Sequence, residues 1–162
     1  MVSELVVRRR ETSDDAWIIA MLTETWGSTR VVSRGRMHDA MTLPGFVAVL
    51  DGQSAGLATH DAEGDSCELV TLNSLIEKRG VGMALIEAVK TEAGRLGCRR
   101  LWLITTNDNT HALRFYQRRG FFFVALHKGA IADSRRLKPE IPAVGNDGIP
   151  IRDEIELAIE LS

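Results

Sequence analysis

The sequence predicts a mixed α/β fold in which one central, mostly antiparallel sheet is covered by helices. A chain of 162 residues, 44% hydrophobic and 26% charged, has the size and composition of a soluble globular domain. Asp51-Gly52 separates two apolar runs, which is the pattern of a β-hairpin. Further along, an apolar strand leads into a glycine turn that opens an amphipathic helix. We therefore treat residues 1–162 as a single domain.

The N-terminal part is predicted to combine one strand with helical segments. Leu5–Arg9 has the apolar character of a first strand. Ser13, followed by two aspartates, is typical of a helix N-cap, and Gly27 is expected to end that helix. Residues 28–33 are predicted to form a loop or a short extended segment. Residues 34–41 are predicted to form a further helical turn or two.

Three antiparallel strands are expected next. Residues 46–50 and 54–60 flank Asp51-Gly52 and form the predicted hairpin. Residues 61–65 are polar and predict a second turn, after which a strand starts near Ser66.

The following helix has a clear apolar stripe. Its members fall at helical offsets and are Leu85, Ala88, Val89, Ala93 and Leu96. Gly97 is expected to end it. Before it, Gly80 and Gly82 form a turn whose backbone N–H groups converge at the positive end of the helix dipole. This arrangement is suited to holding a phosphate, although a tight strand-to-helix connection has the same pattern.

The C-terminal part returns to the sheet. Residues 101–106 predict a strand, and a helix is expected to start at Asn109. Residues 121–127 predict a strand, 130–137 a short helix, and 151–161 the last strand, after a loop rich in proline and glycine.

Composition and charge exclude several classes of function. The net charge of −2 argues against a general nucleic-acid binder, and the short arginine runs are interpreted as solvated faces. Apolar runs are shorter than the roughly 20 residues that cross a bilayer, so no membrane partner is expected. In residues 1–10 the charges follow the apolar residues, the wrong order for a signal peptide, so we expect the cytoplasm. Cys67 and Cys98 lack metal-site spacing, and reduced thiols without a metal are expected.

Two motifs in the right order resemble the GNAT superfamily of N-acetyltransferases. The turn 77–82 matches the family's Gln/Arg-x-x-Gly-x-Gly/Ala signature, with Glu77 in place of Gln or Arg. Asn109, Ala112, Tyr116 and Gly120-Phe121 match its Asn-x-x-Ala-x-x-x-Tyr-x-x-x-Gly-Phe pattern. A carboxylate at Glu77 mildly repels a pyrophosphate, an effect that the two basic residues after it offset.

The resemblance implies a sheet of about seven strands flanked by about four helices. The strands at 67–72 and 100–105 should splay apart and admit the pantetheine arm of acetyl-CoA, the implied co-substrate. That arm would bond to the main chain of Val70 and Leu72 as an added strand does. The implied cofactor-binding residues are Val70, Thr71, Leu72, Glu77, Lys78, Arg79, Gly80, Val81, Gly82, Met83, Asn109 and Tyr116.

Acetylation of an amine requires a base for the nucleophile and an acid for the leaving thiolate. A primary amine is only about 0.1% neutral at pH 7.4, which costs roughly 4 kcal/mol. The resemblance implies Tyr116, the single tyrosine, as the general acid. Glu68 is the leading candidate for the base, because it lies two residues before Val70 and faces the same side. His60 and His127 are alternatives, acting directly or through water. The alternative interpretations without a catalytic role are that Tyr116 is an aromatic residue of the core and that Glu68 is an exposed charge on a strand.

The remaining candidates are residues that could contact the amine acceptor or that lie on the surface. His111 and His38 are interpreted as surface histidines, and Trp26 as a pocket or core residue. Specificity is expected from residues 26–36 and 129–150. Acidic residues gather near the end of the chain and suit either a cationic amine or a solvated edge strand: Asp147, Asp153, Glu154 and Glu156.

The resulting hypothesis is an N-acetyltransferase that moves an acetyl group from acetyl-CoA to a primary amine, by direct attack in a ternary complex. The acceptor is expected to be a small molecule. One alternative is acetylation of a protein N-terminus or lysine, and another is an acyl-CoA-binding sensor without turnover. The resemblance also allows a homodimer.

Overall fold

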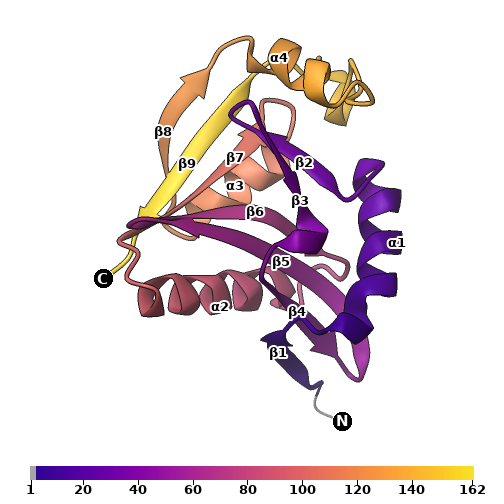
Figure 1. The fold of residues 1–162 in the computed structure, drawn as a ribbon, viewed down its shortest axis with the longest axis vertical. Helices are drawn as coiled ribbons and strands as arrows, with labels where there is room; N and C mark the ends of the chain where they lie inside the picture. Colours follow the sequence, from indigo (N-terminus) through magenta and orange to yellow (C-terminus); the bar gives the residue numbers. More distant parts are fainter. Residues whose placement is uncertain (1–2) are drawn as a thin grey trace.

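A seven-stranded sheet forms the centre of the computed structural model, which describes residues 3–162 (Figure 1). Met1 and Val2, the start of the N-terminal stretch considered above, lie outside the described residues. The strand order is β1-β4-β5-β6-β7-β9-β8. The strands are β1 Leu5–Arg9, β4 Gly45–Leu50, β5 Gln53–Glu63, β6 Ser66–Ser74, β7 Arg100–Thr106, β8 Phe122–His127 and β9 Glu154–Glu160.

Neighbouring strands of this sheet are antiparallel except for β6 and β7, which are parallel. A separate two-stranded sheet consists of β2 Arg30–Ser33 and β3 Arg36–Asp39. The helices are α1 Asp15–Trp26, α2 Val81–Arg95, α3 Thr110–Arg118 and α4 Ala130–Leu137. Short 3-10 turns are η1 Thr12–Asp14, η2 Ala40–Thr42 and η3 Asn146–Gly148. The seven strands and four helices confirm the predicted fold class.

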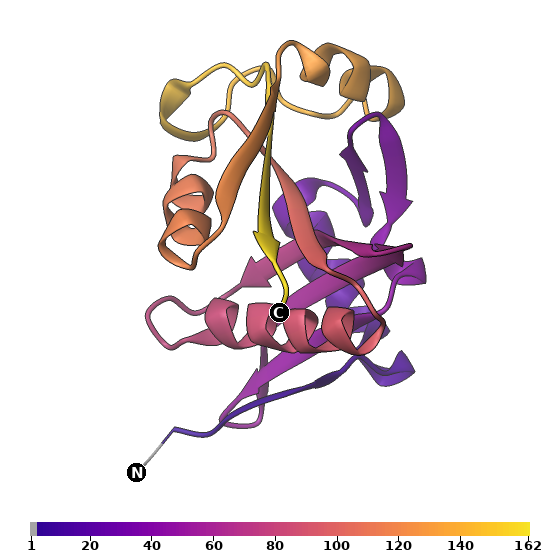
Figure 2. The same ribbon diagram turned by 90° about the vertical axis from the view of Figure 1, so that its left-hand side faces the viewer.

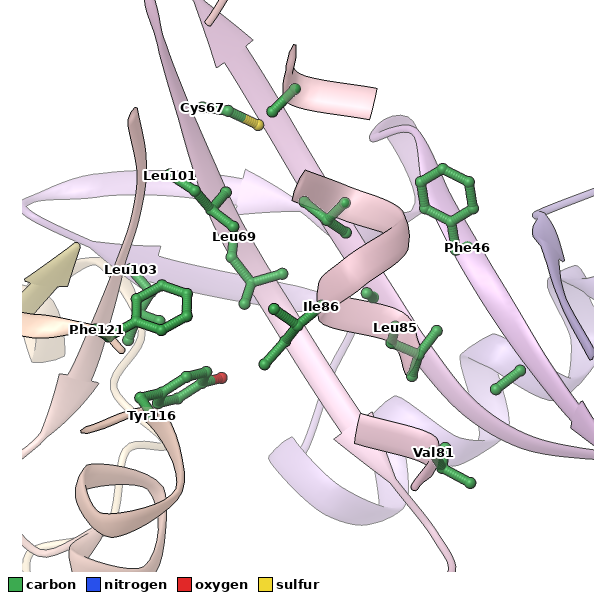
Figure 3. Close-up of a cluster of buried hydrophobic side chains, with 14 of the residues drawn as sticks. Phe46, Cys67, Leu69, Val81, Leu85, Ile86, Leu101, Leu103, Tyr116 and Phe121 are labelled. Atoms are coloured by element: carbon green, nitrogen blue, oxygen red, sulfur yellow. The ribbon is translucent and has the colours of Figure 1, made fainter. Parts of the chain in front are cut away.

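Helices α1 and α2 cover opposite faces of the sheet (Figure 2). Side chains alternate along β4, so Ala48 packs into the cluster with α2, whereas Val47 packs into the cluster with α1. Figure 3 shows the larger cluster, in which Ile86 of α2 lies near Leu69 of β6 and Phe121 lies near Tyr116. Burial of these apolar side chains is the main force that holds α2 on the sheet.

The pairing between β6 and β7 ends early. It covers Ser66–Glu68 on β6 and Arg100–Trp102 on β7, after which both strands continue without pairing to each other. A bulge in the β5–β6 register also leaves Val70 without a partner on β5. The predicted splay is therefore confirmed, and it begins immediately after Glu68.

One predicted helical segment is wrong. Residues 34–41 do not form a helix, because Arg36–Asp39 pairs with Arg30–Ser33 as a β-hairpin. Arg34 and Gly35 form its two-residue turn with φ of 50° and 74°, the left-handed geometry that such hairpins require. Only the 3-10 turn η2 is helical here. The short extended segment predicted for residues 28–33 is confirmed as β2.

The C-terminal strand has a different position from the one considered in the sequence. It covers Glu154–Glu160 rather than 151–161, and it lies between β7 and β8. The interpretation of its acidic residues as a solvated edge strand is therefore wrong, because β8 is the edge strand. The short helix predicted at 130–137 is confirmed as α4.

Gly56 on β5 permits the close approach of α2, and this predicts the effect of a substitution. A Cβ at Gly56 would lie 2.7 Å from the carbonyl oxygen of Asn73 and 2.7 Å from Cγ1 of Val81. We expect Gly56→Ala to lower the free energy of unfolding by about 1–3 kcal/mol, measured by urea denaturation. Gly94→Ala on α2 is the matched control, because its Cβ meets nothing within 4 Å and alanine favours a helix. Equal stability of the two variants would contradict this explanation.

Candidate active site

Glu68 is a buried carboxylate at the point where β6 and β7 separate. Its residue is 5% exposed, and Ser33 Oγ donates a hydrogen bond of 2.6 Å to Oε2. Burial raises the pKa of Glu68 to about 7, and the Ser33 hydrogen bond opposes part of that rise. A carboxylate with such a pKa can accept a proton near neutral pH. The bland interpretation of Glu68 as an exposed strand charge is wrong.

His38 lies directly beside this carboxylate. Its Nε2 is 3.3 Å from Glu68 Oε1, and its Nδ1 is 3.8 Å from Asp61 Oδ2. Burial is the main cause that lowers the pKa of His38, so the ring is mostly neutral near pH 7. The sequence-based interpretation of His38 as a surface histidine is wrong, because strand β3 turns the side chain toward the sheet.

A cavity of about 260 Å³ opens beside Glu68. Its lining is charged and comprises Arg34, Arg36, Asp61, Glu63, Ser66, Glu68, Arg100, Trp102 and Glu156. Arg36 pairs with Asp61 and Glu63, while Arg34 and Arg100 pair with Glu156. Within the described residues 3–162, the ion pairs of Glu68 include no arginine or lysine, so its charge is not neutralised by a permanent cation.

The β2–β3 hairpin forms one wall of this cavity. The Arg34 guanidinium lies 5.3 Å from the centroid of the Trp102 ring, a cation–π arrangement. The backbone N–H of Arg34 donates to Glu154 Oε1 at 3.2 Å. These contacts fix the turn of the hairpin on β7 and β9, and they hold Ser33 and His38 over Glu68.

The acidic residues near the end of the chain divide into two groups. Glu154 and Glu156 are buried on β9, and His127 Nε2 lies 3.1 Å from Glu156 Oε1. Burial raises the pKa of Glu154. Asp153 accepts a hydrogen bond from the N–H of Gly129, and Asp147 lies exposed in η3. Only Glu156 of these four acids lines the cavity.

The predicted phosphate-binding turn precedes α2. Gly80 is the N-cap of α2 with φ of 77°, and Lys78 is also left-handed with φ of 62°. Both conformations leave backbone N–H groups free to point toward a ligand. Glu77, Lys78, Arg79 and Met83 are exposed around the turn, and Val81 is buried.

Gly82 has an additional packing reason that the sequence does not reveal. A Cβ there would lie 3.0 Å from Cζ of Phe115, so the absence of a side chain lets α3 approach the first turn of α2. The same contact brings Tyr116 to this side of the sheet. The role of Gly82 in cofactor binding stays a prediction.

The three predicted cofactor-binding residues on β6 are Val70, Thr71 and Leu72, and they come shortly after the point where β6 and β7 separate. Val70 is the unpaired residue at the bulge, and Leu72 packs partly against the core. Thr71 Oγ1 lies 2.7 Å from Thr59 Oγ1 of β5, so its side chain is already hydrogen-bonded within the sheet. Because pairing with β7 ends at Glu68, the β7 side of β6 is unpaired at these residues, and this is the side from which a ligand in the splay would bond to the backbone.

Asn109 and Tyr116 occupy the two ends of α3. Asn109 is the N-cap, and its Oδ1 accepts a hydrogen bond from the N–H of Ala112 at 3.2 Å. Tyr116 is 8% exposed and packs edge-on against Phe115 and Phe121 (Figure 3). Burial raises the pKa of Tyr116, so its phenol stays neutral near pH 7.

The remaining candidates lie away from Glu68. His60 stacks on Phe46 in the cluster that α2 covers, and this places it on the face opposite Glu68. His111 is exposed on α3. Trp26 is exposed, and its carbonyl accepts a hydrogen bond from Lys138 Nζ at 3.1 Å. The structure therefore joins Glu68 to His38 rather than to His60.

The sequence placed Ser33 and Arg34 only within the predicted specificity segment 26–36, and it did not identify His38 or Trp102 as parts of a site. The signal that could have revealed the hairpin is the pair of valines before Ser33, together with Gly35 as a turn residue.

Two further findings concern metals and membranes. Within residues 3–162 the structure shows no cluster of three or more His, Cys, Asp or Glu side chains arranged to hold a metal ion. None of the helices in this part of the chain has both the length and the apolar character to span a membrane. Cys67 and Cys98 are buried free thiols.

Comparisons with known proteins place these features in a family. A family model described as the acetyltransferase (GNAT) family matches residues 13–121. The uncharacterised protein YdhI of Bacillus subtilis (strain 168) is 44% identical over 131 residues, covering 80% of this chain and 82% of that protein. YxbD of the same strain is 39% identical over 145 residues, covering 89% and 91%.

Solved structures show the same fold. One is a GNAT family acetyltransferase from Elizabethkingia anophelis with acetyl-CoA bound. It matches with a TM-score of 0.72 at 16% identity, covering 97% of this chain and 98% of that chain. At this identity the likeness shows the fold alone.

The burial of Glu68 predicts a dependence of stability on pH. Its pKa is about 4.5 when unfolded and about 7 when folded, so the penalty is absent below pH 4.5 and complete above pH 7. That shift corresponds to about 3 kcal/mol. We expect the wild-type protein to lose more stability than Glu68→Gln between pH 4.5 and pH 8, measured by urea denaturation at each pH. Parallel profiles for the two proteins would contradict the raised pKa.

Proposed function

Because the chain belongs to the GNAT family of acetyltransferases, we propose that it transfers the acetyl group of acetyl-CoA to the primary amine of a small molecule. The reaction proceeds by direct attack in a ternary complex. The observation that carries this proposal is the buried Glu68, with a pKa of about 7, at the start of the β6–β7 splay and beside a cavity.

The cofactor is proposed to bind on the side of α2 and α3. The N–H groups around Gly80 would hold the pyrophosphate at the N-terminus of α2, and Lys78 and Arg79 supply positive charge beside Glu77. The pantetheine arm would run into the splay and bond to the backbone of Val70 and Leu72. Support for this path comes from the unpaired backbone of Val70 and the exposed positions of the turn.

The acceptor is proposed to enter from the cavity on the other face of the sheet. Glu68 takes a proton from the ammonium group of the acceptor, and the neutral nitrogen attacks the thioester carbon. The carbon–sulfur bond then breaks, and Tyr116 donates its phenolic proton to the departing thiolate. Tyr116 belongs to the cluster under α2 and Glu68 faces the other side of the sheet, so the proposal has the two proton-transfer groups act on one thioester from opposite sides.

The shape of the cavity favours a small acceptor over a protein. Its volume of about 260 Å³ is close to the lower end of the range for small-molecule pockets, roughly 300 Å³. The hairpin turn covers it through Arg34, which narrows the access for an extended peptide. A sensor without turnover has no need for a carboxylate with a raised pKa, so the tuning of Glu68 favours an enzyme.

Acetyl-CoA turnover against a panel of amines tests this function. We expect thiol release with at least one small amine, with kcat/KM for the amine falling as the pH drops below about 7, because Glu68 must be deprotonated to act as a base. Glu68→Gln should lower kcat/KM by about 10²-fold or more and remove that titration. Glu87→Gln, on the exposed side of α2, is the matched control and should behave as the wild type. A fully active Glu68→Gln variant would exclude this residue as the base.

Tyr116→Phe tests the general acid. Removal of the hydroxyl leaves the ring packing against Phe115 and Phe121 in place, so folding should be preserved. We expect kcat to fall by about 10²-fold or more with unchanged affinity for coenzyme A, measured by thiol release and calorimetry. Turnover equal to that of the wild type would remove Tyr116 from the mechanism.

A further inference from the structure

We propose that His38 is a proton-relay residue that passes the proton collected by Glu68 to Asp61 at the surface. The proposal rests on the proposed function, because it concerns how the base is restored after each turnover. Glu68, His38 and Asp61 come from β6, β3 and β5, and the hairpin brings the histidine between the two carboxylates.

The geometry brings the three groups within reach of one another, and a bridging water or a small movement of the ring completes the step from His38 Nδ1 to Asp61 Oδ2, which at 3.8 Å is longer than a hydrogen bond. His38 is 5% exposed, with Nε2 at 3.3 Å from Glu68 Oε1 and Nδ1 at 3.8 Å from Asp61 Oδ2. The Asp61 side chain is 26% exposed, whereas that of Glu68 is 7% exposed. An amine in the cavity would cover the open side of Glu68, so the route through His38 leads from the buried base to solvent.

Of the surrounding charges, Arg36 bears most directly on this path, because its guanidinium pairs with Asp61 Oδ2 at 3.6 Å. Charged groups face the cavity from the hairpin (Arg34, Arg36), from β5 (Asp61, Glu63), from β7 (Arg100) and from β9 (Glu156). Glu154 also lies close by, and it accepts the N–H of Arg34. The arginines are paired with Asp61, Glu63 and Glu156, while Glu68 contacts the uncharged groups Ser33 and His38.

His38 takes up a proton at one ring nitrogen and releases a proton from the other. His38 starts neutral with its proton on Nδ1, and Nε2 accepts the proton from the carboxylic acid of Glu68. The imidazolium then gives the Nδ1 proton to Asp61, which releases it to water. Water then takes the remaining proton from Nε2 and returns one to Nδ1, which restores the starting tautomer. Burial and the Arg36 guanidinium disfavour the charged ring, while the Asp61 carboxylate favours it, so the histidine takes up a proton and does not retain it.

Kinetics of His38 variants test the relay. Restoration of Glu68 follows the chemical step, so we expect His38→Gln to lower kcat by about 10²-fold while kcat/KM for the amine changes much less. In His38→Ala the missing ring leaves room for free imidazole, and kcat should rise with imidazole concentration. The wild-type kcat should not respond. His111→Gln, an exposed histidine on α3, is the matched control and should keep the wild-type kcat.

Two results would overturn the relay. One is a wild-type kcat in His38→Gln, and the other is a reduced kcat in both His38 variants without any response to imidazole. Titration of His38 by NMR gives a readout without turnover, because Asp61→Asn should lower the pKa of His38. An unchanged His38 pKa would also contradict the relay. If the wild type itself releases no thiol with any amine, the proposed function fails, and this outcome is separate from the NMR result.

Discussion

The early end of the pairing between β6 and β7 is the constraint on which the rest of the structure depends. Two parallel strands held over their full length would bury their backbone groups in each other and leave no opening in the sheet. Here the pairing stops after Glu68 and Trp102, and the bulge at Val70 frees further backbone. Beyond these residues the facing backbone groups of β6 and β7 do not bond to each other, and this is where the proposed cofactor arm would run.

The two faces of the sheet beside the separation of β6 and β7 carry different candidate groups. On one face, α2 and α3 approach closely because Gly82 has no side chain, and this contact places Tyr116 near the glycine turn. On the other face, the β2–β3 hairpin covers Glu68 with Ser33 and His38. The proposed acid and the proposed base thus belong to separate layers, which would meet at one bond between β6 and β7.

The sequence predicted the parts of this arrangement that depend on local pattern. The stripe of α2, the glycine turn and the cap at Asn109 all follow from residues near one another in the chain, and the structure has each of them, except that Leu96 of the predicted stripe is the C-cap of α2 and is exposed. The contacts of Glu68 were not predictable in this way, because Ser33 lies 35 residues away. The hairpin at β2–β3 was also hidden, because an Arg-Gly pair is a weaker hairpin signal than Asn-Gly. The burial of Glu154 was also hidden, because the last strand inserts between two earlier ones.

The β2–β3 hairpin is a sheet of its own, joined to the central one by side chains and loops and not by a strand ladder. The hairpin shields Glu68 from water, so without the hairpin over it the pKa of this carboxyl group would return to its usual value. By thermodynamic linkage, proton uptake by Glu68 and closure of the hairpin must then favour each other to the same extent. Acidification would therefore hold the β2–β3 hairpin more tightly over Glu68 and the cavity beside it, and alkaline conditions would loosen it.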